Sequence, residues 1–375
     1  MKKLFKIDAG NDYSINKRVV NFLNPEYVCV FFNNPEILGI LKNVLKNRVI
    51  EPDNIFSHSS VSGSIAGVVD ICVDNIDKKA IFLKNDFKEK DVRKTVKKIG
   101  SCDELVYMLK GSPYQDLFVH KNIKNIVVNG IKDEPLVTTE SYILKNRSDE
   151  IIETISYLDE IYNFDKSFIV LKNSENDNIS EYLSKSGSYP NMNVLALENK
   201  YLIGRSEFLL NKIKVSKEES IIITPSELME IRSIFKKNVL ASEKYISVID
   251  VESKKIRFVY VKKNVLVSEV LNKLKLLKTD RKFLKNGLIN GTLINPNKEV
   301  ITADVDAIFI IKEEKIISKK CINCGKCVSV CPAGLNPKKN FDKKYIDPKC
   351  INCGSCSFFC PSNVKFYRNR DGGKK

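Results

Sequence analysis

The sequence predicts a multidomain α/β protein that ends in a ferredoxin-like domain with two [4Fe-4S] clusters. Three observations support this prediction. Eight of the eleven cysteines lie beyond residue 320, in two copies of one spacing. Strands and helices alternate through the middle of the chain, which is typical of a parallel sheet covered by helices. A chain of 375 residues is also too long for one small core, so we expect several domains.

We expect four domains, and changes in the local pattern place their boundaries. They are an N-terminal β barrel-sandwich-like domain at 1–84, a Rossmann-like α/β domain at 85–241, a β-grasp (SLBB-like) domain at 242–315 and a dicluster ferredoxin domain at 316–367.

Short β-rich stretches punctuated by Ser and Gly predict tight hairpins in the first domain. Residues 27–32 read as a strand, Pro35 to Lys46 as a helix with Pro at its start, and Ala80 to Lys84 as a closing strand. His58 lies in a Ser-rich turn and has no acidic or cysteine partner nearby in sequence. A hydrogen bond within the turn is therefore favoured over a ligand or catalytic role.

The α/β domain begins with a helical pattern over 89–111 and then alternates between apolar strands and amphipathic helices. The segment that starts at Thr224 has Pro early and Glu in its first turn, which is typical of a helix start. The expected strands are 125–129, 167–171, 193–197 and 220–224, and the expected helices are 148–162, a polar helix through Tyr182, and one from Thr224.

In the third domain the pattern changes to strand, strand, helix and strand, which predicts a β-grasp. The expected elements are strands 245–251 and 255–261, a helix over 267–277, and strands 299–302 and 307–311.

The cysteine runs Cys321–Pro332 and Cys350–Pro361 both read C-x2-C-x2-C-x3-C-P. This is the bacterial-type spacing for [4Fe-4S] clusters, in which the fourth cysteine of each run ligates the other cluster. Structural zinc more often uses two separated cysteine pairs, and disulfides suit small secreted domains. We therefore predict a first cluster on Cys321, Cys324, Cys327 and Cys360, and a second on Cys350, Cys353, Cys356 and Cys331.

Gly325 and Gly354 lie inside the cysteine turns, where tight backbone conformations are needed. The other three cysteines have more ordinary interpretations. Cys29 and Cys72 lie on apolar strands and are expected in the core. Cys102 lies near a helix start, where a lowered thiol pKa is an alternative to a buried or surface thiol without a redox role.

Lys and Arg exceed Asp and Glu by 62 − 46 = 16. The lysines are scattered, which favours a solvated surface; the alternative is docking of an acidic redox partner near Lys338, Lys339, Lys343 and Lys344. No nucleic-acid-binding module is recognisable. No apolar run is long enough to cross a bilayer and the start does not read as a signal peptide, so we expect a reducing cytoplasmic location.

Several segments resemble the C subunit of Rnf electron-transport complexes. The same family includes cobalamin-reductase-type proteins and the electron-transfer protein associated with D-proline reductase. The similar segments are His58–Gly63, Val128–Pro135 with Thr138 and Thr139, Tyr189-Pro190 and the cysteine run Cys321–Pro337.

The resemblance implies an FMN- and NADH-binding domain, but a defining loop is altered. Active members bind FMN through a glycine-rich loop, whose glycines let backbone N–H groups approach phosphate. The corresponding stretch here, Gly100–Pro113, keeps two glycines and places Asp103 and Glu104 where phosphate would lie. We therefore predict that binding of FMN and NADH has been lost. If flavin is retained, Asn129 and Glu134, beside Gly111-Ser-Pro113, are its expected contacts.

The leading hypothesis is an electron carrier without catalysis of its own. It would pass single electrons through two [4Fe-4S] clusters between a donor and a reductase, and the resemblance suggests anaerobic amino-acid (proline) reduction. The alternative is an NADH-oxidising flavin and iron–sulfur subunit of an Rnf-like membrane complex. A third hypothesis is a structural subunit, attached peripherally to the inner face of the membrane. The expected partners are redox proteins.

Overall fold

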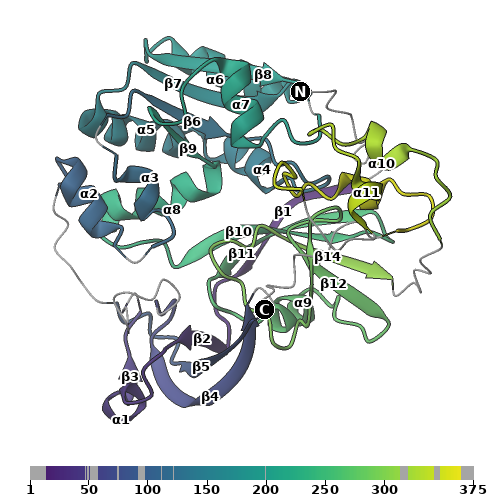
Figure 1. The fold of residues 1–375 in the computed structure, drawn as a ribbon. Helices are drawn as coiled ribbons and strands as arrows, with labels where there is room; N and C mark the ends of the chain where they lie inside the picture. The colour runs from purple at the N-terminus through teal and green to yellow at the C-terminus, as the bar shows by residue number, and fades with distance from the viewer. Residues whose placement is uncertain are drawn as a thin grey trace.

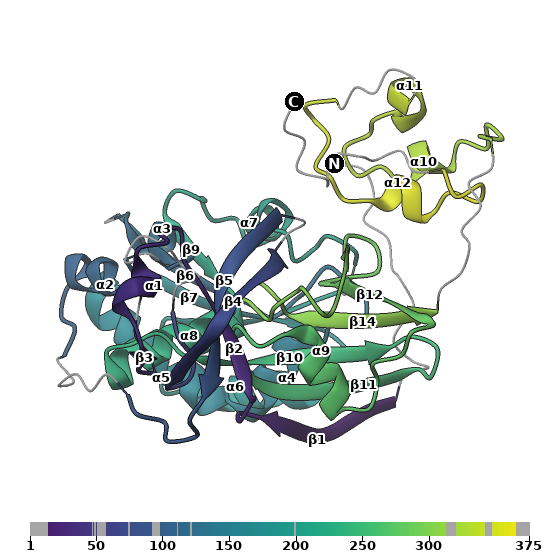
Figure 2. The ribbon, with the colours of Figure 1, turned by 90° about the horizontal axis from the view of Figure 1, so that it is seen from below.

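The computed structural model describes residues 14–46, 48, 50, 58–73, 76–91, 98–110, 112–120, 122–198, 200–312, 320–341 and 347–364. Three sheets form the body of the molecule. In Figure 1 the α/β domain lies at the top, a sheet near the N-terminus lies at the bottom, and a mixed sheet lies between them. The cluster helices stand to one side of this body (Figure 2).

The N-terminal sheet has the strand order β2-β5-β4-β3 and is antiparallel throughout. Its core contains Val28, Val30, Ile81 and Leu83, all fully buried. The elements are β2 (Tyr27–Phe31), α1 (Ile37–Ile40), β3 (Asn43–Val44), β4 (Gly63–Val73) and β5 (Ile76–Asn85). Whether this sheet is part of a barrel-sandwich domain stays a prediction.

The helix expected from Pro35 to Lys46 is wrong beyond one short turn, α1. Gly39 lies inside this segment, and glycine weakens a helix interior by about 1 kcal/mol. Val44 then pairs with Gly63 of β4, so part of the second half of the segment forms a strand of the sheet instead of a helix. Residues 51–57, directly before His58, lie outside the described residues.

The α/β domain is built on the parallel sheet β8-β7-β6-β9, which confirms the predicted alternation. Alternate residues of β6 and β7 face opposite cores: Val128 packs with α5 and α8, and Val127 packs with α7. Both faces of the sheet are therefore covered. Its strands are β6 (Asn125–Asn129), β7 (Lys166–Lys172), β8 (Met192–Leu197) and β9 (Ser220–Ile223).

The helices of this domain include several that the sequence pattern predicts and several that it does not. The helix predicted over 148–162 is confirmed as α5, and Thr224 with Glu227 forms a capping box at the start of α8. The bounds are α2 (Cys102–Met108), α3 (Gln115–Phe118), α4 (Thr139–Asn146), α5 (Ser148–Tyr162), α6 (Asn176–Ser186), α7 (Ser206–Ile213) and α8 (Pro225–Lys237).

The third sheet is mixed, in the order β1-β11-β10-β14-β12-β13. Its edge strand β1 falls within the range predicted for the first domain, yet it pairs in parallel with β11. Only a bridge between Leu266 and Val300 forms where a strand was expected at 299–302. The elements are β1 (Ser14–Phe22), β10 (Glu243–Asp250), β11 (Lys255–Lys262), α9 (Val267–Lys273), β12 (Arg281–Lys285), β13 (Thr292–Ile294) and β14 (Ala307–Lys312). The β-grasp assignment stays a prediction.

A partly buried carboxylate, that of Glu243, joins the N-terminal sheet to the third sheet. The Glu243 Oε1 atom lies 2.7 Å from the Lys262 Nζ atom and 3.2 Å from the Nζ atom of Lys46, which follows β3. Burial alone would raise the pKa of Glu243, but the charge of Lys262 and its hydrogen bond outweigh burial and lower the pKa from 4.5 to about 2. The two lysines thus stabilise the ionised carboxylate.

We expect this carboxylate to make stability depend on acid pH. A lowered pKa means that the folded state binds the proton more weakly than the unfolded chain does. The contribution of Glu243 is therefore present above pH 4.5 and is lost as pH falls from about 4.5 to about 2. Urea unfolding across this range should show a weaker loss of stability in the Glu243→Gln variant than in the unsubstituted chain. Equal pH slopes in the two proteins would contradict the prediction.

Candidate iron–sulfur centre

The two cysteine runs fold as a structural repeat. Gly325 and Gly354 adopt φ values of +74° and +72° and start the short helices that follow them. Side chains are strained at such φ values, which explains the glycine in each turn. The helices are α10 (Lys326–Ser329), α11 (Pro337–Phe341) and α12 (Ser355–Phe358).

One cavity joins the two runs. It has a volume of about 220 Å³, and its lining includes Cys321, Cys324 and Cys327 of the first run together with Cys360 of the second. These are the four cysteines predicted to hold the first cluster. The fold thus brings the fourth cysteine of the second run close to the first three cysteines of the first run.

The second set of cysteines is more enclosed. Burial, followed by the charges of Cys353 and Cys350, raises the pKa of the Cys356 thiol to about 12. Thiolates crowded in this way repel one another, and bound iron would supply the compensating positive charge. Cys331 stays a predicted ligand of this set.

Backbone donors support the fourth cysteine of each run in the same manner. The N–H of Leu335 donates to Cys331 Sγ at 3.3 Å, and the N–H of Val364 donates to Cys360 Sγ at 3.4 Å. Such bonds to cluster sulfurs are one of the factors that set reduction potential. None of the eight cysteines forms a disulfide. Across the described ranges no three Cys, His, Asp or Glu side chains converge on a single metal ion, so the ligand assignment rests on the repeated motif and the cavity.

The residues predicted to contact flavin make internal hydrogen bonds. Asn129 donates from Nδ2 to the Gly204 carbonyl at 2.7 Å and accepts from the Ile131 N–H. Glu134 accepts from the N–H groups of Ile289 and Asn290 at 3.0 and 2.6 Å. Both side chains therefore hold loops together.

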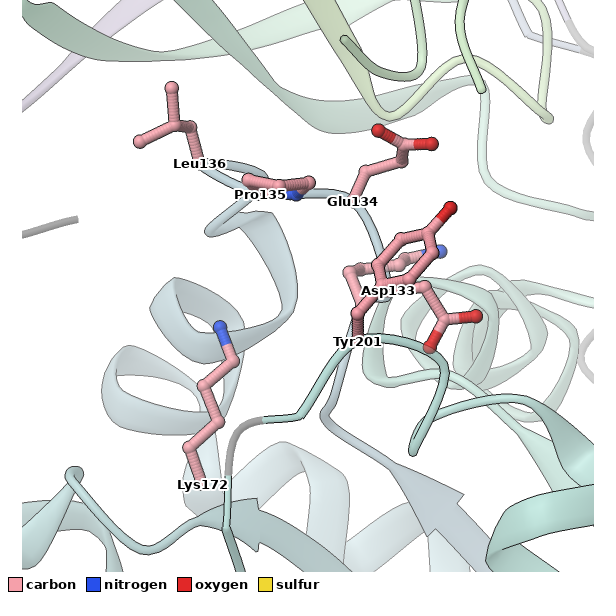
Figure 3. A pocket seen from close by; sticks show the side chains of 7 residues that line it. Asp133, Glu134, Pro135, Leu136, Lys172 and Tyr201 are labelled. Atoms are coloured by element: carbon pink, nitrogen blue, oxygen red, sulfur yellow. The ribbon is translucent and has the colours of Figure 1, made fainter. Parts of the chain in front are cut away.

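The pocket beside Glu134 is smaller than the pockets that usually enclose a ligand. Its volume is about 40 Å³, against roughly 300 Å³ or more for pockets that enclose ligands of drug size. Figure 3 shows the Glu134 carboxylate pointing away from Lys172, toward neighbouring backbone. The pocket is lined by Lys132, Asp133, Glu134, Pro135, Leu136, Lys172 and Tyr201.

The stretch compared with the flavin-binding loop forms the start of helix α2. Ser101 caps this helix by accepting from the Glu104 N–H, and the Glu104 carboxylate accepts from the Gly100 N–H. The Glu104 carboxylate thus accepts the hydrogen bond from a backbone N–H group that a phosphate would otherwise need. Figures 1 and 2 both place α2 on the far side of the molecule from α10 and α11. Gly111 lies outside the described residues.

His58, Cys29, Cys72 and Cys102 lie in surroundings that fit structural roles. Burial, followed by the charge of Lys263, lowers the pKa of His58 to about 3, so its ring is neutral. Its backbone carbonyl accepts from Asn264 at 3.0 Å. Cys29 is fully buried, as predicted, while Cys72 is only partly buried. The thiol of Cys102 contacts the Phe118 carbonyl and the Tyr162 hydroxyl.

Two family models match parts of the chain. The Nuo51 FMN-binding domain matches residues 115–239, and a 4Fe-4S dicluster domain matches residues 320–364. The C subunit of the ion-translocating oxidoreductase complex of Buchnera aphidicola subsp. Baizongia pistaciae is 29% identical over 237 residues, which cover 58% of this chain and 46% of that protein. Over 58% of its length, the chain is thus similar to C subunits of ion-translocating oxidoreductase complexes.

Another relative of this chain is the C subunit of the Na(+)-translocating ferredoxin:NAD(+) oxidoreductase complex of Acetobacterium woodii. It is 20% identical over 230 residues, which cover 58% of this chain and 52% of the relative. The chain thus spans about half the length of the curated relatives it matches. An NAD+-reducing [NiFe]-hydrogenase structure aligns with 67% of this chain and 52% of its own, at 10% identity and a TM-score of 0.48.

The dicluster match and the cysteine motif support two [4Fe-4S] clusters, as predicted. Among the described helices of the chain, none is both long and apolar enough to span a bilayer.

Sequence reasoning did not find two residues that contact the second cysteine run. Tyr201 and Arg205 follow β8 in an ordinary loop, and no motif marks them. Both donate to backbone carbonyls about 150 residues further along the chain. Bonds of this kind leave no spacing pattern in a sequence.

Proposed function

We propose that this chain passes single electrons through two [4Fe-4S] clusters, between a donor and protein partners in an Rnf-type assembly. The observation that carries the proposal is the cavity shared by three cysteines of the first run and Cys360 of the second. Such sharing is typical of modules that hold two clusters close together. Each cluster would accept and release one electron.

The exposure of the first run supports a role for it in contact with a partner. Cys321 and Cys324 are exposed, and the Ile322 and Val328 side chains beside them are 64% and 40% exposed. Lys326, Lys338 and Lys339 are also exposed and close to the run in sequence. Apolar side chains among basic ones suit transient docking of an acidic redox protein.

We propose that this exchange proceeds without flavin. Asn129 and Glu134 already satisfy backbone groups of their own chain, and the pocket beside Glu134 is smaller than the pockets that usually enclose a ligand. A role in anaerobic proline reduction, and peripheral attachment to the inner face of a membrane, rest on the family resemblance.

The second candidate function is oxidation of NADH through a bound flavin. The match of residues 115–239 to the Nuo51 FMN-binding domain favours it. A flavin would be required in that case, because hydride delivers two electrons at once and each cluster takes one.

Anaerobic reduction separates the two functions. We expect dithionite to bleach the visible absorbance of the clusters, and NADH to leave it unchanged even after incubation with FMN. Addition of a separate flavin-containing NADH oxidoreductase together with a low-potential carrier serves as the control, and should restore bleaching by NADH. Bleaching by NADH alone would contradict the flavin-free proposal and favour the second function.

A further inference from the structure

The α/β domain holds the second cysteine run by its backbone. The Tyr201 hydroxyl donates to the Cys353 carbonyl at 2.5 Å, and Arg205 Nη1 donates to the Ile351 carbonyl at 2.5 Å. Both donors come from the loop between β8 and α7. This loop therefore fixes the segment that carries two of the predicted ligands, Cys350 and Cys353.

An apolar contact reinforces these hydrogen bonds. Cys353 belongs to the same buried cluster as Leu202 and Phe208, and Ile351 packs against it. That cluster also covers one face of the parallel sheet. The second run is thus continuous with the core of the α/β domain.

The first run starts with the same five residues but has none of this support among the described residues. Both runs begin Cys-Ile-Asn-Cys-Gly. Ile322 is 64% exposed where Ile351 is partly buried, and Cys324 is exposed where Cys353 is buried. The difference between the two copies therefore comes from their surroundings.

A second loop reaches the same run from the third sheet. A Cβ atom at Gly354 would lie 2.9 Å from the Ile289 carbonyl oxygen, so the two backbones are in close contact. The carboxylate of Glu134 holds this loop through the N–H groups of Ile289 and Asn290. The residue predicted to contact flavin instead supports a loop beside the second run.

We propose that Arg205 and Tyr201 are positioning residues that fix the second cysteine run and set the reduction potential of its cluster apart from that of the first. This rests on the proposed function, because it requires both clusters to be present. Reduction adds negative charge to a cluster, so a nearby guanidinium favours the reduced state. Asp133 Oδ2 lies 3.5 Å from Arg205 Nε and opposes this effect.

The test is a redox titration followed by electron paramagnetic resonance at pH 8, on the full chain with both clusters. At this pH the Asp133 carboxylate, whose pKa burial raises to about 6, is ionised. We expect Arg205→Gln to disfavour reduction of one cluster by about tenfold, equivalent to about 59 mV for one electron, and to leave the other unchanged. Arg205→Lys should restore most of the potential, and Asp133→Asn should shift it in the opposite direction.

Variants that keep only one cluster show which cluster's reduction potential shifts. In a Cys324→Ser background, which keeps the second cluster, Arg205→Gln should lower the potential; in a Cys353→Ser background it should have no effect. Lys212→Gln, which removes an exposed charge from α7 of the same domain, is the matched control and should shift neither cluster.

Equal shifts in both clusters, or no shift beyond that of Lys212→Gln, would overturn the inference while leaving the proposed function intact. An unsubstituted chain that holds no reducible cluster would contradict the proposed function itself. The Arg205→Gln variant could lose the second cluster altogether. In that case, retention of the second cluster in Arg205→Lys supports the positioning role. Loss of the second cluster in Arg205→Lys as well argues against the positioning role.

Discussion

The Cys360→Ser variant is expected to lose the cluster of the first cysteine run, although Cys360 belongs to the second. The other cysteines that line the cavity containing Cys360 all belong to the first run: Cys321, Cys324 and Cys327. Removal of one of four thiolates should leave that cluster too weakly held to survive purification. Iron content should fall from about eight to about four atoms per chain.

Paired variants make this prediction specific. Cys324→Ser should leave the same paramagnetic signal as Cys360→Ser, and the double variant should match either single variant. Cys331→Ser and Cys353→Ser should instead leave the other signal. If Cys360→Ser matched Cys353→Ser, each run would hold its own cluster and the crossed assignment would be wrong.

The Lys285→Met variant is expected to lose about 3–5 kcal/mol of folding free energy, because it removes the ammonium group that pairs with a buried carboxylate. The Lys285 Nζ atom lies 2.9 Å from Glu299 Oε1, and both side chains are at most 3% exposed. Lys285 ends β12, directly before the loop that contacts Gly354. The measurement is urea unfolding of the iron-loaded protein, with the loss of cluster absorbance followed in parallel.

An exposed pair in the same chain provides the control. Lys79 and Asp70 lie 3.2 Å apart with 68% of each side chain exposed, so Lys79→Met should change stability by at most about 1 kcal/mol. A double variant Lys285→Met/Glu299→Leu should recover much of the loss, since it removes the buried carboxylate together with its partner. A Lys285→Met variant as stable as Lys79→Met would show that the buried pair contributes little.

Much of the α/β domain could be predicted from its sequence, because local pattern and tertiary burial agree there. Strand β6 is buried at every position, and its central Ile-Val-Val reads as one short apolar run. The capped start of α8 is equally local, since Thr224 and Glu227 satisfy each other's backbone groups. The paired cysteine runs were recognisable because cluster ligation fixes their spacing.

Elements with charged sequences were missed. Strand β12 reads Arg-Lys-Phe-Leu-Lys and resembles a basic surface segment, yet it pairs with β14, and Lys285 is buried against Glu299. The role of Arg205 was hidden for a related reason. Its hydrogen bond to the Ile351 carbonyl depends on the packing of two distant segments, which a local pattern cannot report.

The most direct test of the account is anaerobic quantification of iron, acid-labile sulfide, zinc and flavin in one sample of the full chain. We expect about eight iron and eight sulfide atoms per chain, as two [4Fe-4S] clusters require, with flavin far below one per chain. Colourless protein that holds zinc, or one flavin per chain released by acid, would contradict it.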